Sequence, residues 1–261
     1  MTPPSALEKR EAPNCNSCNG LEELKRESAN APHELPQREQ PLRMDNTLTL
    51  ELPKPAAVSS MRLLGRVLVA CEYSGTVRDA FAARGWDAWS CDLLPSEKPG
   101  NHYQGDARDI LGECWDIMVA HPPCTHLAVS GARWFKDKVR EQAEALDFVR
   151  LLLAAPIPHI ALENPVSVIS SKIRKPDQVI QPWQHGHGET KATCLWLKNL
   201  PRLTPSNIVE GREGRVWKMP PSADRWKERS RTLPGVAGAM ANQWTLATRP
   251  KSHARRTWLT N

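Results

Sequence analysis

The sequence predicts an α/β fold in which helices cover both faces of an open, doubly wound sheet. Short apolar runs of strand length alternate with amphipathic helical segments between residues 66 and 162. Each run ends at a turn residue or a proline, and strands that alternate with helices form parallel βαβ units. The chain has 261 residues, which is enough for one such domain and an appendage.

The first part of this pattern predicts two strands around one helix. An apolar run at Arg66–Cys71 predicts the first strand, and Trp86–Cys91 predicts the second. Between them, Thr76–Arg84 has its apolar residues on one helical face, with Thr76 as the expected N-cap and Gly85 as the expected C-cap. A first βαβ unit is therefore expected within residues 66–91.

The alternation continues and then fades. Strands are expected at Asp116–Ala120 and His159–Leu162, joined by a long amphipathic helix at Val139–Ala155. A short element is expected to begin at Gly105-Asp106. After the last of these strands few periodic runs remain apart from Ala192–Leu197, until the small residues of Pro234–Trp244 predict a closely packed helix.

The pattern divides the chain into five parts. Residues 1–60 are rich in Pro, Glu, Asn and Ser without periodicity, which predicts a disordered tail. A chain starting at residue 61 is therefore expected to keep every folded part. The other parts are a core at 61–169, a small basic region at 170–230, a returning helix at 231–247 and a basic tail at 248–261.

Charge and cysteine content narrow the class of protein. Residues 1–60 carry a net charge of −2 and the remainder +8, so a basic folded part favours a polyanionic partner. The sequence has neither an apolar run of roughly 18 residues nor an apolar signal-peptide core, so no membrane partner is expected. Seven cysteines at irregular spacing are typical of reduced thiols, and a cytoplasmic protein is expected.

The most informative segment is His121-Pro-Pro-Cys124, which directly follows an apolar run. Two prolines fix φ and remove two backbone donors, so the strand stops and the thiol lies at the tip of a turn. Ligands of open α/β sheets bind at the carboxyl ends of strands, where such a thiol is a candidate nucleophile. A small buried core cysteine is the alternative.

Glu163 ends the next apolar run, Ile160–Leu162, and Asn164-Pro165 then turns the chain. A carboxyl group just outside an apolar strand is partly desolvated, which would raise its pKa and allow it to donate a proton. A thiol nucleophile and a carboxylic acid in one pocket suit attack on an electron-poor ring, with protonation of a ring nitrogen.

Three further features end predicted strands or lie close to them. Backbone N–H groups at Tyr73-Ser74-Gly75, before the first helix, would cradle a charged ligand. Asp92 would bind the hydroxyls of a ribose, and Asp106 lies in a loop near the same pocket. Each has a structural alternative: an ordinary tight turn at Gly75, and a helix cap or a surface charge for the aspartates.

The order Tyr73-Ser-Gly, Asp92, Gly105-Asp106, Pro-Pro-Cys124 and Glu163-Asn-Pro resembles the DNA cytosine-5 methyltransferases, over roughly residues 67–165. The resemblance implies a Rossmann-like class I S-adenosylmethionine-dependent methyltransferase fold, with a small, irregular target-recognition region. It also implies DNA as the partner of a monomer, with the target cytosine flipped out of the duplex.

The resemblance implies a role for each motif. Cys124 would attack C6 of cytosine, Glu163 would hydrogen-bond or protonate N3 and the amino group, and C5 would take a methyl from S-adenosylmethionine. A free thiol has a pKa of about 8.5, so the site must lower it or remove the proton. Tyr73 and Asp106 would lie at the adenine and Asp92 at the ribose. The residues assigned to the cofactor are Tyr73, Ser74, Gly75, Asp92, Asp106 and Pro122.

The chain departs from the family pattern at several positions. Val77 stands where the family has a second glycine, and Thr125 follows Cys124 where glutamine is usual. The family's arginine motif after Glu-Asn-Pro is missing, and Lys191 is its candidate replacement, although an ammonium is not a planar fork. The residues assigned to DNA are Thr125, Ser130, Lys191, Arg215 and Arg225.

Aromatic and basic residues are interleaved between residues 170 and 230. This combination suits an unpaired or flipped nucleic acid strand. In the alternative interpretation the tryptophans form a small core, which is favoured for Trp196, and the basic residues are a solvated face. The tryptophans are Trp183, Trp196, Trp217 and Trp226.

Two short motifs contain metal-ligand residue types without a complete ligand set. One is Cys15-Asn-Ser-Cys18, and the other is His185-Gly-His187-Gly-Glu189. Because a structural zinc ion needs four ligands, no metal site is expected.

Two other functions remain open. One is an enzyme that modifies C5 of a free pyrimidine nucleotide or transfers a group other than methyl. The other is a non-catalytic DNA-binding relative, which Cys124 and Glu163 argue against because neither is needed to bind phosphates. An amino-methyltransferase is disfavoured because those enzymes carry an aromatic residue after the two prolines.

Overall fold

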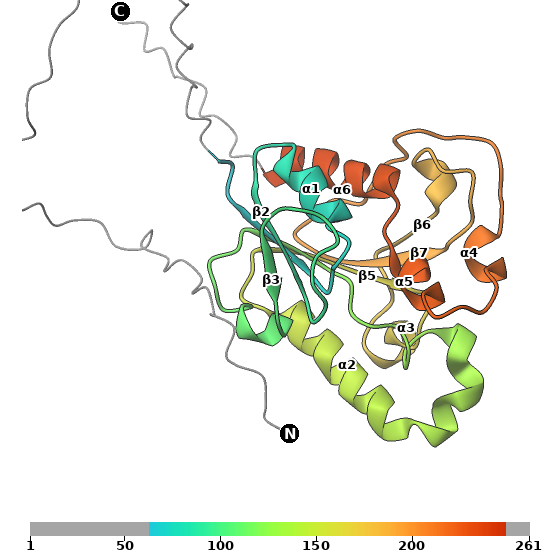
Figure 1. Ribbon diagram of the computed structural model, residues 1–261. Helices are drawn as coiled ribbons and strands as arrows, with labels where there is room; N and C mark the ends of the chain where they lie inside the picture. The colour runs from blue at the N-terminus through green and yellow to red at the C-terminus, as the bar shows by residue number, and fades with distance from the viewer. Residues whose placement is uncertain (1–62, 249–261) are drawn as a thin grey trace, which may run out of the picture. The chain divides into compact units, whose positions relative to one another are not determined.

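The computed structural model describes residues 63–248, which form a seven-stranded sheet in the order β3-β2-β1-β4-β5-β7-β6 (Figure 1). Strands β1 to β5 are parallel, whereas β7 is antiparallel to both of its neighbours. The predicted doubly wound, Rossmann-like class is thereby confirmed. The strands are β1 Arg66–Ala70, β2 Asp87–Asp92, β3 His102–Gln104, β4 Ile117–Ala120, β5 His159–Pro165, β6 Gln178–Ile180 and β7 Thr193–Lys198.

Helices cover both faces of the sheet, with α1 and α6 together on one face and α2 on the other (Figure 1). The α-helices are α1 Thr76–Ala82, α2 Val139–Ala154, α3 Ile169–Lys172, α4 Arg215–Lys218, α5 Arg225–Ser230 and α6 Pro234–Thr248. Three 3-10 segments are η1 Ala107–Asp109, η2 Val129–Asp137 and η3 Pro182–Gln184.

The two hydrophobic cores follow from the alternation of side chains along the strands. Val67 and Val69 of β1 point to the face covered by α1 and α6, where Trp244 is fully buried. Leu68 points to the opposite face, where it packs in a cluster with Leu152 of α2. A strand buried on both faces needs apolar residues at every position, which is why β1 is a continuous apolar run.

The amino end of α1 differs from the prediction. The N-cap is Gly75, in the left-handed region at φ +68, and not Thr76. The buried Glu72 carboxylate accepts hydrogen bonds from the backbone nitrogens of Val77, at 2.7 Å, and Arg78, at 3.2 Å. A carboxylate from before the turn therefore satisfies the free amides of the first helical turn.

The boundary expected after residue 169 is wrong as a division of the sheet. Residues 178–180 and 193–198 are β6 and β7, so part of the small basic region completes the core sheet. The irregular remainder carries only the short helices α4 and α5. The three-residue β3 and the η2 segment were not predicted, because neither has a periodic apolar pattern.

The expectations for residues 1–60 and for the basic tail after Thr248, including Cys15 and Cys18, lie outside the described residues. Within residues 63–248, no helix is both long enough and apolar enough to span a bilayer.

Candidate active site at the carboxyl edge of the sheet

Cys124 lies in a tight turn just beyond β4. The backbone nitrogen of His121 still bonds to the Ala70 carbonyl, at 2.9 Å, and the two prolines then end the pairing. The Cys124 carbonyl accepts hydrogen bonds from the backbone nitrogens of Leu127 and Ala128. Cys124 is exposed, so the alternative of a buried core cysteine is excluded.

The electrostatic surroundings of Cys124 oppose ionisation in the ligand-free protein. Partial burial of the thiol raises its pKa, and the negative charge of Glu163 raises it further. The cations Lys191 and Arg229 act in the opposite direction. The thiol therefore stays protonated at neutral pH until a partner removes its proton.

Asn164 joins the Cys124 turn to the next strand. Its side-chain nitrogen donates to the Pro122 carbonyl at 2.9 Å, and the residue is 1% exposed. Because Pro122 has no N–H with which to pair to a neighbouring strand, the bond from Asn164 to its carbonyl is what fixes this part of the turn to β5. The sequence motifs Pro-Pro-Cys and Glu-Asn-Pro are thus physically linked.

Glu163 lies within β5, opposite Leu195 of β7, and not beyond the end of the strand as predicted. Its Oε2 lies 3.1 Å from Nδ1 of His121. The expectation of a raised pKa is also wrong. Burial alone would raise the pKa of Glu163, but the hydrogen bond and charge of His121 and the charge of Lys191 lower it below its usual value. Glu163 is therefore a carboxylate, able to accept hydrogen bonds and protons.

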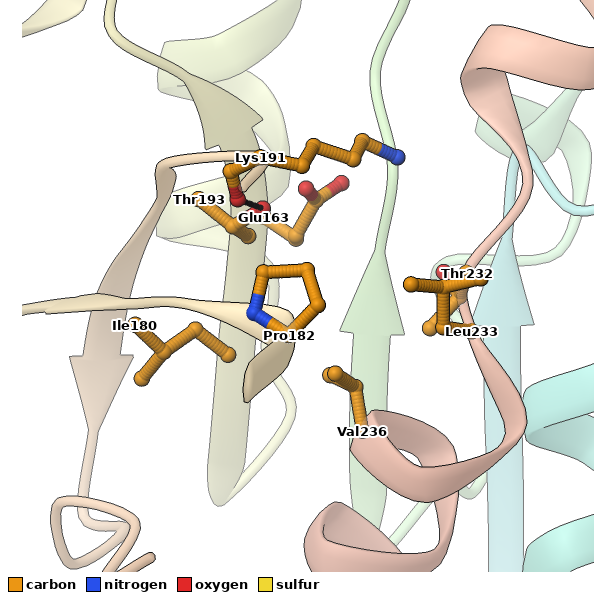
Figure 2. A pocket seen from close by; sticks show the side chains of 8 residues that line it. All are labelled: Glu163, Ile180, Pro182, Lys191, Thr193, Thr232, Leu233 and Val236. Carbon is orange, nitrogen blue, oxygen red and sulfur yellow. Dashed lines mark hydrogen bonds between the residues drawn. The ribbon is translucent and has the colours of Figure 1, made fainter. Parts of the chain in front are cut away.

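Lys191 precedes β7 and reaches back over Glu163. Figure 2 shows its side chain running beside the Glu163 carboxylate, with Thr193 next to both. Its Nζ donates to the carbonyl of Arg231 at 3.0 Å. The small cavity beside them encloses about 20 Å³, which is room for one water molecule. The antiparallel direction of β7 brings this lysine to the edge where β5 ends.

In the predicted cofactor turn, the side chains of Tyr73 and Ser74 form hydrogen bonds within the chain, and Gly75 packs closely against Arg78. The Tyr73 hydroxyl donates to the Lys227 carbonyl at 2.8 Å, and the Ser74 hydroxyl lies 3.1 Å from Glu72 Oε1. A Cβ at Gly75 would meet the Arg78 guanidinium at 2.5 Å. Glycine is therefore required at this turn for a left-handed φ and for close packing of Arg78.

The two aspartates differ in their surroundings. Asp92 ends β2, accepts a hydrogen bond from the backbone nitrogen of Leu94 at 3.0 Å, and has its pKa raised by burial. Asp106 accepts from the backbone nitrogen of Arg108 at 2.9 Å and pairs with its guanidinium at 2.7 Å. The structural alternative of a cap therefore describes Asp106. Both carboxylates raise the pKa of the Cys71 thiol, so they gather at one edge, beyond β1.

Residues 225–233, here called the 225–233 segment, pack against Tyr73. The Arg231 guanidinium forms a two-pronged ion pair with Glu97, one contact of which is 2.8 Å. The Tyr73 and Trp226 ring centroids lie 6.3 Å apart. Sequence reasoning assigned no role to Glu97 or to His121, although the position of His121 directly before Pro-Pro-Cys could have drawn attention to it.

The residues assigned to DNA have different environments. Thr125 and Ser130 are exposed after Cys124, and Lys191 lies in the Glu163 pocket. Arg215 is ion-paired with Glu189 at 2.9 Å, and Arg225 donates to a backbone carbonyl at 2.8 Å. Thus three of these five side chains, those of Lys191, Arg215 and Arg225, already have partners within the chain.

The tryptophans of the basic region divide into core and surface. Trp196 is fully buried, which confirms its assignment to the core. Trp217 and Trp226 are 62% and 55% exposed. The Arg212 guanidinium lies 3.9 Å from the centre of the Trp183 ring. Within residues 170–230, the two exposed tryptophans therefore belong to α4 and α5.

The His-Gly-His motif has internal partners. His185 Nδ1 lies 3.0 Å from the Ser206 hydroxyl, and His187 Nε2 accepts from the backbone nitrogen of Gly235 at 2.9 Å. No group of three or more metal-ligand side chains occurs within residues 63–248.

Comparison with known proteins identifies no family. No protein-family model matches the chain, and no curated protein matches it. A similar solved structure is an E. coli prophage protein provisionally described as a DNA modification methyltransferase, with 17% identity and a TM-score of 0.41. The match covers 60% of this chain and 55% of that one, so it spans little more than half of that protein. At this level of similarity we infer neither fold nor function from it.

Proposed function

We propose that the protein is an S-adenosylmethionine-dependent DNA methyltransferase that acts on C5 of cytosine through a covalent bond between Cys124 and C6. The observation that carries the proposal is that Cys124, in the turn just beyond β4, lies close enough to Glu163, within the last half of the adjacent strand β5, for the carboxylate to raise the pKa of the thiol. Asn164 ties their two loops together at 2.9 Å. An exposed thiol beside a buried carboxylate suits addition to a pyrimidine better than the binding of phosphates.

The ionised state of Glu163 determines how the reaction begins. Attack by Cys124 requires loss of the thiol proton, and the resulting ring needs a proton at N3. A carboxylate with a lowered pKa can accept the first proton and then deliver one to N3, so that protons balance. Before attack, the same carboxylate accepts a hydrogen bond from the cytosine amino group. Glu163 thus acts as base first and as acid second.

The remaining steps restore the aromatic ring. Bond formation between Cys124 and C6 makes C5 nucleophilic, and methylation there is followed by transfer of the C5 proton to solvent water. The Cys124 thiolate then leaves C6, and the proton on N3 returns to Glu163 and from there to the thiolate. Bound S-adenosylmethionine would supply the methyl group. Lys191 keeps positive charge beside both Glu163 and Cys124, which favours the thiolate at the moments of attack and departure.

The edge beyond β1 and β2 fits an adenosyl cofactor in part. Asp92 is a partly buried carboxylate at the end of β2, as expected for a group that binds ribose hydroxyls. Tyr73 follows β1 and Pro122 follows the neighbouring strand β4, but Tyr73 is only 7% exposed and packs against Trp226. By contrast, Glu72 already satisfies the first amides of α1, so we assign those amides no role toward the cofactor.

The test is expression in a host that lacks cytosine methylation, followed by digestion of the DNA and mass analysis of its nucleosides. We expect 5-methylcytosine with the wild-type chain and a loss of at least about 10³-fold in Cys124→Ala. The matched control is Cys114→Ala, an exposed cysteine before the opposite end of β4, which should retain full activity.

Three other outcomes would contradict the proposal. Unmodified DNA with a modified deoxycytidine monophosphate pool would indicate a free nucleotide substrate. A mass increment other than methyl would preserve thiol chemistry with a different donor. Unmodified DNA and nucleotides, with DNA binding intact, would indicate a binding protein.

A further inference from the structure

His121 is the nearest polar partner of Glu163 and has no part in the chemistry described above. It follows β4 directly, and its Nδ1 lies 3.1 Å from Glu163 Oε2. The two side chains are only 9% and 13% exposed. A carboxylate can only accept, so the imidazole must donate its Nδ1–H to Glu163. This contact fixes which ring nitrogen carries the proton.

The other ring nitrogen gives a second, independent observation. His121 Nε2 is buried and has no hydrogen-bond partner within residues 63–248. A buried polar atom without a partner destabilises a fold, so packing alone does not explain a histidine at this position. The hydrogen bond to Glu163 is therefore the one polar contact described for this ring, and the ring is oriented by it.

The groups around Glu163 come from several elements. His121 approaches from the end of β4, while Lys191 and Thr193 approach from the β7 side. Two thiols also lie near Glu163, that of Cys124 and that of Cys194 in β7; burial raises the pKa of each, and the charge of Glu163 raises it further. The α6 side contributes Leu233 and Val236, which are apolar and carry no charge. Of these groups, His121 is the hydrogen-bond donor that follows β4, the same strand that leads to Cys124.

We propose that His121 is a positioning residue that holds the Glu163 carboxylate in a fixed orientation toward the base through the hydrogen bond from its Nδ1. The inference rests on the proposed function, in which Glu163 must accept a proton before it donates one. His121 does not touch the substrate in this scheme.

The experiment compares His121→Ala with His121→Asn, whose amide nitrogen can take the place of Nδ1. The first measurement is a ¹³C NMR titration of the Glu163 carboxyl group, assigned with Glu163→Gln. We expect a pKa below the ordinary glutamate value of 4.5 in the wild type, a higher pKa in His121→Ala, and recovery in His121→Asn. Burial raises the pKa of Glu163 and the His121 hydrogen bond lowers it, so the pKa should increase when the donor is removed.

The second measurement is the pH profile of methyl transfer. In His121→Ala we expect kcat to fall at least about tenfold and its acidic limb to move to higher pH, with KM for DNA within about threefold. His121→Asn should restore most of kcat. The control is His159→Ala, a histidine at the opposite end of β5 that contacts the Asp116 carbonyl and should change neither titration nor profile.

The outcomes separate this inference from the proposed function. An unchanged Glu163 titration in His121→Ala, or a wild-type pKa above 4.5, overturns the positioning role even if DNA is methylated. A shifted titration in a protein that methylates nothing rejects the proposed function and supports the pair. A shift of equal size in His159→Ala marks a general disturbance of the sheet and also overturns the role.

Discussion

Lys191 contributes a charge to the site without the directed hydrogen bonds of a guanidinium. Its ammonium lowers the pKa of both Glu163 and Cys124, whereas its one direct bond goes to the Arg231 carbonyl. A compact cation of this kind stabilises developing negative charge without dictating the plane of its partner. The hydrogen bonds of His121 and Thr193 therefore orient the Glu163 carboxylate, and Lys191 supplies positive charge near it.

Removal of that charge should slow chemistry at the thiol. In Lys191→Gln the pKa of Cys124 rises further, so less thiolate is present at a fixed pH, and alkylation of Cys124 should slow severalfold. The rate is measured with iodoacetamide between pH 7 and 9 by following the Cys124 peptide in a mass spectrometer. Lys198→Gln, at the far end of β7, should react like the wild type. Equal rates in the two variants would contradict the electrostatic role of Lys191.

The surroundings of Glu163 show why the local sequence could not predict whether its carboxyl group is protonated. The apolar run before Glu163 correctly predicts burial, and burial alone would raise its pKa. The sign is reversed by His121 and Lys191, which lie 42 and 28 positions away in the sequence. Charge partners across a sheet depend on strand order and direction, and neither is contained in a local pattern.

At the level of elements, the loops after β4 and β5 act as one unit. Asn164 bonds to the Pro122 carbonyl, and the backbone of Val129 bonds to the Val166 carbonyl at 3.0 Å. Strand β5 continues through Pro165 because β7 pairs with it there. The turn that presents Cys124 is therefore held by the neighbouring strand β5 as well as by its own backbone hydrogen bonds.

Loss of this tie should be costly. Asn164→Ala removes a buried donor and leaves the Pro122 carbonyl without it, so we expect a loss of about 1–3 kcal/mol in the free energy of unfolding. Urea denaturation followed by circular dichroism measures the change. Asn101→Ala, which removes an exposed bond to Asp87, should cost less than about 0.5 kcal/mol. Similar costs for the two variants would show that the loops are held by other contacts.

Long-range pairing also explains which elements the sequence predicted well. Strands β1, β2 and β4 and helix α2 carry continuous or periodic apolar residues, and each was predicted to within about two residues of its bounds. Strand β6 is a three-residue segment among polar residues, whereas β7 coincides with the run at Ala192–Leu197; the pairing of β7 with β5 and β6 places both strands in the sheet. The motif residues Cys124 and Glu163 were predicted, whereas His121 and Glu97 act through partners that only the fold brings close.

On the scale of the whole described region, the 225–233 segment contacts two separate sites. At the edge beyond β1, its Lys227 carbonyl receives the Tyr73 hydroxyl and its Arg231 side chain pairs with Glu97. At the Glu163 pocket, the Arg231 carbonyl receives Lys191 Nζ. The cofactor proposed for the first site and the cytosine proposed for the second would therefore both lie next to the 225–233 segment.

The consequence is heterotropic coupling. A ligand that shifts this segment at one site changes the free energy of binding at the other, and thermodynamic reciprocity requires the same factor in both directions. We expect the affinity for S-adenosylhomocysteine, measured by calorimetry, to change at least about fivefold when a cytosine-containing duplex is bound. In Glu97→Gln, which loosens the shared segment, that factor should fall toward one. Equal wild-type affinities with and without DNA would mean that the sites are filled independently; a clear factor would mean that the protein favours one order of ligand addition.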